Sequence, residues 1–207
     1  KGIERNSAEL ADRISQRGHD VHFHCLRWMD VSSSAVRFHK VPTLNLANSS
    51  KLLSFAILGK VSLDRGQYDV THSYGNVVGC DVITAQSCHR AGMDVIKSLP
   101  KKSIKSYLNY GIADRVRLSI EHRNYTERRY RKVIAVSGGV RREIMQYYNV
   151  PGKDIEVIPN GVDLVEFTPE HREELREAVR GRLGIGADDF VLIFVAHEFD
   201  RKGLESI

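Results

Sequence analysis

The chain has 207 residues, of which 42% are hydrophobic and 28% are charged. This composition is typical of a folded globular protein, and it excludes a disordered chain, a collagen and a coiled coil. No apolar run approaches the ~20 residues that a membrane-spanning helix needs, so we expect no such helix. The 31 basic and 26 acidic side chains give a net charge of +5. This excess is modest, and its distribution along the chain is more informative.

Helical and extended patterns alternate over the first part of the chain. Apolar residues at helical spacing predict a helix over residues 3–17, and Gly18 supplies a left-handed stop. The further elements predicted here are a helix over 50–63 and strands over 21–26, 36–42, 68–73 and 81–85. A helix that leads into a strand in this way normally follows an earlier strand. We therefore expect the first strand of the sheet to be missing from the sequence.

The alternation continues through the middle of the chain. An apolar repeat every four residues predicts a long, highly charged helix over 103–130, followed by an all-apolar strand over 133–136. Ser137 is the expected N-cap of the next helix, which ends at Asn149, and residues 155–158 are the next predicted strand. Strands that alternate with helices and are apolar on both faces predict an α/β fold with a mostly parallel, Rossmann-like sheet.

The pattern changes in the last quarter of the chain. A helix is predicted from Pro169 at its first position to a stop at Gly184, and an apolar run predicts a buried strand over 190–195. One such unit has too few elements to bury both faces of its strand. We therefore expect these residues to open a second domain whose remainder is not in the sequence.

A turn-rich segment separates the two parts. Pro159, Asn160 and Gly161 form the expected hinge between them. The predicted division is a Rossmann-like domain over residues 1–160, then a linker and the beginning of a second domain over residues 161–207. On this interpretation the fold is truncated at both ends.

The three cysteines, Cys25, Cys80 and Cys88, match neither a zinc-binding pattern nor a disulfide framework. We expect them to be buried as small hydrophobic residues in a reducing compartment, with the cytoplasm as the default location. No signal peptide is visible in the sequence.

Two positions are candidates for binding a phosphate group. Gly2 lies where a helix begins, and the free backbone N–H groups there suit an anion such as a diphosphate, although an ordinary tight turn has the same pattern. Arg201 and Lys202 follow the predicted strand over 190–195, at the edge of the sheet where ligands collect in α/β folds. Their charges suit a phosphate leaving group, although a solvated basic turn has the same residues.

The residues after the predicted strand over 81–85 also lie at a carboxyl end. His89 is a candidate base or hydrogen-bond partner for a substrate hydroxyl, with Gln86 and Ser87 beside it. A nucleophilic Cys88–His89 pair is less attractive, because adjacent side chains usually point apart and no orienting acid is evident.

The region from residue 97 to residue 132 is strongly basic. It holds eleven basic and three acidic side chains, a net charge of +8, whereas the rest of the chain sums to −3. Interleaved tyrosines make this stretch suitable for an anionic membrane surface or a phosphorylated acceptor, and nucleic acid is a further alternative. A solvated helix face has the same composition. The basic residues proposed to meet the membrane or the acceptor are Lys101, Lys102, Lys105, Arg115 and Arg117.

Four segments together resemble the family 4 retaining glycosyltransferases, which have the GT-B fold. These segments are Gly2–Asn6, Val133–Ser137, Val157–Asp163 and Phe194–Gly203, in the expected order and spacing. The long basic stretch and the cysteine–histidine segment narrow the resemblance to the branch that includes the lipopolysaccharide core glucosyltransferases.

The resemblance implies roles for individual residues. Gly2, Arg201 and Lys202 would lie at the donor diphosphate, and His89, Arg201 and Lys202 would be the catalytic residues. On the acceptor and sugar side the resemblance places Glu4, Gln86, Ser87 and His89. The first domain would be the acceptor-side domain, and the second would bind the nucleotide sugar.

The implied reaction is transfer of a hexosyl unit from a UDP- or GDP-sugar to a lipid-linked or polysaccharide acceptor with retention of configuration. No cofactor and no metal are expected, since the sequence has no Asp-x-Asp cluster and its cations suit the departing diphosphate. We expect a peripheral protein on the inner face of the cytoplasmic membrane that binds no nucleic acid. The acidic motif that contacts the donor in this family is not in the sequence, so we expect the chain alone to be inactive.

Two other functions remain open on the sequence. One is a non-catalytic module whose basic helix docks on an anionic membrane or on nucleic acid. The other is an unrelated nucleotide-binding protein such as a dehydrogenase, although the sequence has no G-x-G-x-x-G turn.

Overall fold

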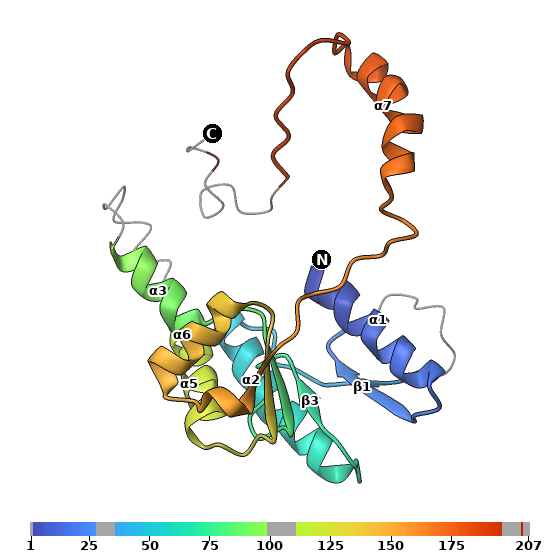
Figure 1. Ribbon diagram of the computed structural model, residues 1–207. Helices are drawn as coiled ribbons and strands as arrows, with labels where there is room; N and C mark the ends of the chain where they lie inside the picture. Colours follow the sequence, from blue (N-terminus) through green and yellow to red (C-terminus); the bar gives the residue numbers. More distant parts are fainter. Residues whose placement is uncertain (1, 28–35, 99–110, 196–203, 205–207) are drawn as a thin grey trace. The chain divides into compact units, whose positions relative to one another are not determined.

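The computed structural model describes residues 2–27, 36–98, 111–195 and 204, and it divides into two compact units, Lys1–Gly161 and Val162–Ile207 (Figure 1). The helices of the first unit are α1 (Gly2–Gln16), α2 (Asn48–Arg65), α3 (His89–Ser98), α5 (Ile112–Thr126), α6 (Gly138–Tyr148) and the short 3-10 helix η1 (Gly152–Asp154). Its strands are β1 (Val21–Cys25), β2 (Val36–Lys40), β3 (His72–Ser73), β4 (Val82–Ala85), β5 (Lys132–Ala135) and β6 (Ile155–Val157). The second unit contains α7 (Pro169–Leu183).

The strands form two parallel sheets. One pairs β1 with β2, and the other has the order β3-β4-β5-β6. In the larger sheet Ile83 is in register with Val133, which is in register with Ile155. All described pairings are parallel, so the predicted α/β fold with a parallel sheet is confirmed.

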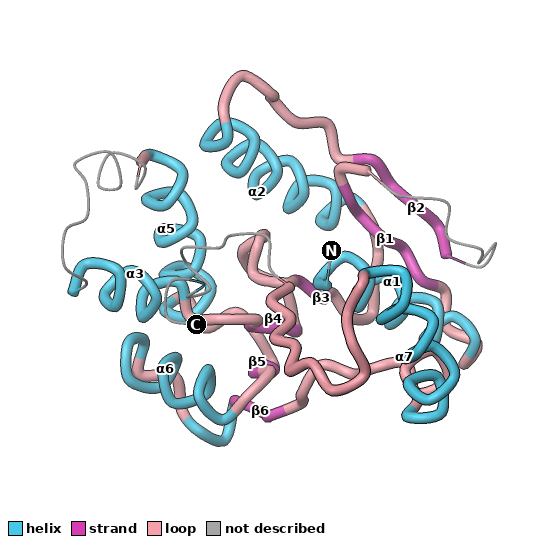
Figure 2. Tube along the Cα trace, turned by 90° about the horizontal axis from the view of Figure 1, so that it is seen from above, coloured by secondary structure: helices cyan, strands magenta, loops and turns pink. Residues whose placement is uncertain are grey.

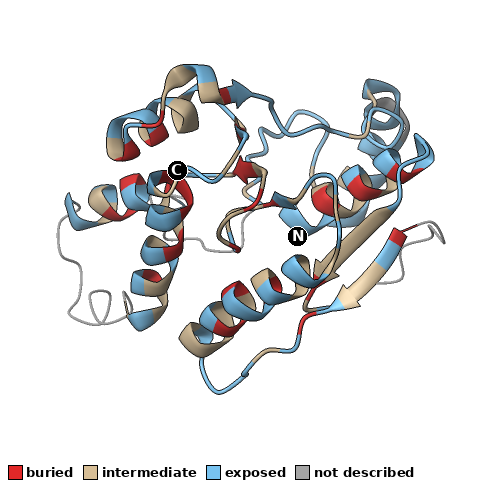
Figure 3. Ribbon diagram, turned by 90° about the horizontal axis from the view of Figure 1, so that it is seen from below, coloured by how far each residue is buried: buried red, intermediate tan, exposed pale blue. Residues whose placement is uncertain are grey.

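The core of the first unit lies between the larger sheet and three helices. In Figures 1 and 2, α3, α5 and α6 gather beside this sheet, whereas α1 lies beside β1 and β2. Ile83, Val133 and Ile144 are almost completely buried there, and Tyr125 and Tyr148 pack with them. Figure 3 shows the buried positions interspersed with exposed ones along these helices. Burial of this apolar cluster is the main force that holds the helices on the sheet.

Several helix ends follow the sequence signals. The Ser137 hydroxyl accepts the Val140 N–H at 3.2 Å, so the predicted N-cap is confirmed. Asn149 and Gly184 both adopt the left-handed conformation, with φ of 52° and 68°, and they end α6 and α7 where the sequence predicted. No helix in the part of the chain that the structure describes is long and apolar enough to cross a membrane.

Three predicted elements differ from the structure. The strand predicted over 68–73 is reduced to the two residues of β3, and the hydroxyl of Tyr68 lies 3.0 Å from His24 Nε2 of β1. Of the long helix predicted over 103–130, the structure describes the part from residue 111 onward, which contains α5. This helix ends at Thr126, before the predicted end, because Arg128 adopts a φ of +48°. Helix α3 was not predicted, although it begins at a candidate site residue.

The prediction of a buried strand over residues 190–195, all of which the structure describes, is wrong. These residues form no strand, and Phe190 and Val195 are 88% and 90% exposed. A strand needs a neighbour that satisfies its backbone groups, and the described part of the second unit offers none. Helix α7 likewise buries none of its described residues.

Candidate functional site

The segment that links β4 to α3 forms the centre of the candidate site. Ala85 is the last residue of β4, Gln86 is half-buried, Ser87 is exposed, and His89 is the first residue of α3. This segment lies at the carboxyl edge of a parallel sheet, where ligands bind in open α/β folds. The structure therefore places three of the predicted acceptor-side residues together on one short connection.

The predicted hinge contacts this segment directly. The amide of Gln86 donates to Asn160 Oδ1 at 3.2 Å, and the amide of Asn160 donates back to Gln86 Oε1 at 2.9 Å. Both bonds require the two side chains to face each other, so they fix the end of β4 against the segment after β6. Pro159 and Gly161, the other hinge residues, are exposed.

The imidazole of His89 faces a carboxylate from α5. His89 Nε2 lies 3.4 Å from Asp114 Oδ1, and the side chain of Asp114 is only 12% exposed. The same oxygen accepts a hydrogen bond from Arg117 Nη1 at 2.9 Å. The ring and the carboxylate therefore face each other at close range, although His89 Nε2 makes no hydrogen bond within the described part of the chain.

A second carboxylate from α5 caps the start of α3. Glu121 accepts the backbone N–H groups of His89, at 2.6 Å, and of Arg90, at 2.9 Å. It also accepts the hydroxyl of Tyr148 from α6, and burial together with this bond raises the pKa of Tyr148. The carboxylate thus complements the positive end of the α3 dipole and links three helices.

The thiol of Cys88 is buried behind this segment. Its side chain lies 3.9 Å from Glu121 Oε1, and burial raises its pKa to about 12. The thiol is therefore neutral near pH 7, which is unsuitable for a nucleophile. Cys25, Cys80 and Cys88 are all free and buried, so the prediction of buried, unpaired cysteines is confirmed. Within the described ranges, no group of three or more His, Cys, Asp or Glu side chains is arranged to hold a metal ion.

The predicted diphosphate residue of the first unit lies on another helix. Gly2 begins α1, Glu4 lies in its first turn, and α1 packs on β1 and β2. Both residues are exposed, and a Cβ added at Gly2 would meet no atom within 4 Å. The described neighbours therefore leave this helix end open and do not require a glycine there.

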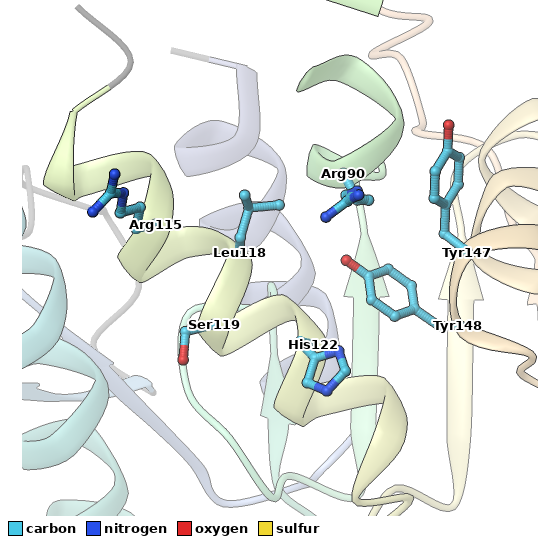
Figure 4. Close-up of a pocket in the computed structure, with 7 residues that line it drawn as sticks. All are labelled: Arg90, Arg115, Leu118, Ser119, His122, Tyr147 and Tyr148. Atoms are coloured by element: carbon cyan, nitrogen blue, oxygen red, sulfur yellow. The ribbon is translucent and has the colours of Figure 1, made fainter. Parts of the chain in front are cut away.

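A pocket of about 500 Å³ lies on the helical side of the first unit. Figure 4 shows that its lining side chains come from α3, α5 and α6. They are Arg90, Arg115, Leu118, Ser119, His122, Tyr147 and Tyr148. Of the predicted site residues that the structure describes, only Arg115 lines this pocket, whereas Arg117 pairs with Asp114.

Five predicted site residues lie outside the described residues. They are Lys101, Lys102, Lys105, Arg201 and Lys202. Their assignment to a basic surface and to the donor diphosphate stays a prediction.

Sequence reasoning missed the two carboxylates that support His89. Asp114 and Glu121 are two of only three acidic residues in the basic region from residue 97 to residue 132. They are seven residues apart, which places them on one face of a helix two turns from each other. Two isolated acids on one face of a basic helix were the signal for a buried polar contact.

The fold matches a solved glycosyltransferase. The crystal structure of WaaG, a glycosyltransferase involved in lipopolysaccharide biosynthesis, superposes with a TM-score of 0.76 at 18% identity, covering 99% of this chain and 54% of WaaG. The fold is therefore the α/β GT-B fold of that protein, over about half of its length.

The sequence comparisons agree with this fold. The lipopolysaccharide glucosyltransferase WaaG of Escherichia coli (strain K12) is 19% identical over 205 residues, which are 99% of this chain and 53% of WaaG. The D-inositol 3-phosphate glycosyltransferase of Kineococcus radiotolerans is 39% identical over 64 residues, which are 31% of this chain and 14% of that protein. The chain thus spans about half the length of WaaG. The model of Glycosyltransferase Family 4 matches residues 1–166, and the chain therefore belongs to glycosyltransferase family 4.

Proposed function

We propose that this chain is the acceptor-side part of a glycosyltransferase that moves a hexosyl unit from a UDP- or GDP-sugar to a lipid-linked or polysaccharide acceptor. The observation that carries the proposal is the family match over residues 1–166. The similarity to a lipopolysaccharide glucosyltransferase supports a glycolipid acceptor of the same broad kind. The first unit would hold the acceptor, and residues 161–207 would be the linker and the beginning of the nucleotide-sugar domain.

The proposed reaction retains the configuration of the sugar. The bond between the sugar C1 and the diphosphate oxygen breaks, and its electron pair leaves with the diphosphate. The acceptor oxygen forms the new bond on the same face, and its proton passes to the departing diphosphate. Such a step needs no protein nucleophile, so positioning and electrostatic stabilisation of the leaving group supply the catalysis.

Each predicted residue has a part in this scheme. Arg201 and Lys202 neutralise the diphosphate as negative charge develops on it, and the N–H groups at Gly2 provide further donors. His89 hydrogen-bonds the acceptor or the transferred sugar, with Gln86, Ser87 and Glu4 on the same side. The position of His89 supports this role, because its ring lies at the carboxyl edge of the sheet, 3.4 Å from the Asp114 carboxylate. Pro159, Asn160 and Gly161 form the hinge between the domains.

The basic region is proposed to meet an anionic membrane. Lys101, Lys102, Lys105, Arg115 and Arg117 would contact anionic lipids or the acceptor on them, at the inner face of the cytoplasmic membrane. The exposed guanidinium of Arg115 supports this proposal, although Arg117 is engaged by Asp114. A module that only docks on the membrane, without transfer, is the alternative outcome of the assays.

The test uses the protein expressed from its complete natural reading frame. It is screened against UDP- and GDP-hexoses by thermal shift, and release of the nucleoside diphosphate is measured with a glycolipid acceptor extract. Lys202→Ala should abolish release without lowering the melting temperature, and Lys153→Ala, which removes an exposed cation of η1, should leave it unchanged. Turnover by Lys202→Ala at a near-normal rate would refute the assignment of the diphosphate site, and no transfer from any donor would refute the function.

A further inference from the structure

Glu121 has an unusual position for a carboxylate in a helix. It lies in the middle of α5, yet its hydrogen bonds go to the start of α3 and to the end of α6. One oxygen accepts the His89 N–H at 2.6 Å, and the other accepts the Arg90 N–H at 2.9 Å. Two charge-assisted bonds of this length hold a backbone segment more firmly than neutral ones.

The bonds of Glu121 also occupy a helix N-terminus that would otherwise be open to an anionic ligand. The N-terminus of a helix attracts anions through its free N–H groups and its dipole. At α3 the protein's own carboxylate takes this place, and the hydroxyl of Tyr148 and the thiol of Cys88 lie on the same oxygen. A phosphate of the substrate is therefore excluded from these two amides.

The other groups around His89 depend on where α3 begins. The ring meets Asp114 from the first turn of α5, seven residues before Glu121, while Gln86 is held by Asn160. Helix α5 thus contacts His89 twice, with Glu121 on the backbone and Asp114 on the ring. A shift of the α3 N-terminus would move the imidazole away from Asp114.

We propose that Glu121 is the positioning residue of His89, and that it fixes the imidazole against Asp114 on the acceptor side of the site. The inference deepens the proposed function and rests on it for the role of His89. Glu121 itself touches no reacting atom. Its removal is expected to impair the transfer step while binding of the nucleoside diphosphate is unchanged, because the residues proposed for the diphosphate lie on other segments.

The experiment compares Glu121→Gln with wild type in the complete protein. The glutamine keeps the shape but presents an N–H group where an N–H acceptor is needed. We expect the amide signals of His89 and Arg90 and the ring signals of His89 to move in ¹⁵N NMR spectra. We expect kcat to fall roughly 10- to 100-fold, with the Kd for the nucleoside diphosphate unchanged. Glu127→Gln, which removes the same charge near the end of α5, should leave both unchanged.

The two measurements separate this inference from the proposed function. Unmoved ring signals of His89 in Glu121→Gln would overturn the positioning role, and so would moved signals with an unchanged kcat. If wild type transfers no sugar, the proposed function fails, and the NMR spectra alone decide the role of Glu121. If Glu121→Gln does not fold, Tyr148→Phe replaces it, since it removes one partner of Glu121 and keeps the aromatic ring. It should move the same His89 signals, and unchanged spectra would overturn the inference.

Discussion

Replacing Asp81 with asparagine should destabilise the larger sheet. One oxygen of Asp81 accepts the N–H of Thr71 at 2.9 Å and its hydroxyl at 2.7 Å, and the other lies 2.8 Å from Arg131 Nε. The backbone carbonyl of Asp81 also accepts from Arg131 and Lys132. Asp81 therefore joins the beginning of β4 to the segments that lead into β3 and β5.

The size of the effect follows from these contacts. Charge-assisted hydrogen bonds contribute about 1.5–3 kcal/mol and neutral ones about 0.5–1.5 kcal/mol. Asparagine keeps an acceptor for Thr71 but loses the charge on both bonds. The pair with Arg131 adds little, because that guanidinium is 71% exposed. Since Asp81 is itself partly exposed, we expect Asp81→Asn to lower the free energy of unfolding by about 1–2 kcal/mol at pH 7. For a chain of this length, that corresponds to a loss of roughly 2–8 °C in Tm.

The effect should depend on pH with a defined sign. The hydrogen bonds from Thr71 are the main cause that lowers the pKa of Asp81 below its usual value of 3.8. A carboxylate whose pKa is lowered by folding stabilises the fold above its unfolded pKa, and this contribution is lost as the pH falls through the folded pKa. The difference between wild type and Asp81→Asn should therefore be constant from pH 7 to pH 5 and shrink below about pH 4.

The assay is urea unfolding followed by circular dichroism at pH 7, 5 and 3.5, with Asp69→Asn as the control. Asp69 is exposed and lies two residues before Thr71, so its replacement should change the free energy of unfolding little. Carboxyl NMR titration of Asp81 measures its pKa directly. Equal stability of Asp81→Asn and wild type at pH 7, or a difference that persists undiminished at pH 3.5, would refute the reasoning.

Two further predictions concern charge. Replacing Lys101, Lys102 and Lys105 with glutamate should weaken binding to anionic vesicles at low salt by at least roughly 100-fold, since each cation near the surface contributes ~1 kcal/mol. The control replaces the exposed residues Arg17, Arg65 and Lys153 with glutamate, and it should weaken binding less. An equal loss of vesicle binding in the two variants would contradict the basic-surface proposal. His24 stacks on His39 at 4.6 Å and meets Ser62 and Tyr68, and burial with the neighbouring His39 and His22 lowers its pKa. Because the unfolded state binds the proton first, wild type should lose stability as the pH falls below about 6.5. The free energy of unfolding of His24→Gln, measured with urea, should fall less steeply with decreasing pH than that of wild type, by up to ~1.4 kcal/mol per pH unit. Identical pH dependences of the two proteins would show that His24 does not contribute to this loss of stability.

Local signals were sufficient for most of the fold. Gly18, Asn149 and Gly184 each end a helix in a left-handed conformation, and Ser137 and Thr168 cap the helices they precede. Such signals act within a few residues, so the sequence alone carries them. The apolar run over 190–195 had an equally clear pattern, and it predicted a buried strand. A strand also needs a neighbouring strand to pair with, and the described residues do not supply one.

The sequence by itself determined the parallel α/β fold and the family, and it predicted the segment after β4 as the candidate site. These depend on periodicity, on turn residues and on motifs, which are properties of short stretches. Only the tertiary structure decided how His89 is held. Asp114 and Glu121 contact His89 from 25 and 32 residues further along the chain, and Asn160 contacts Gln86 from 74 residues further along. Contacts between such distant residues are set by how helices pack on the sheet, and no local pattern encodes that packing.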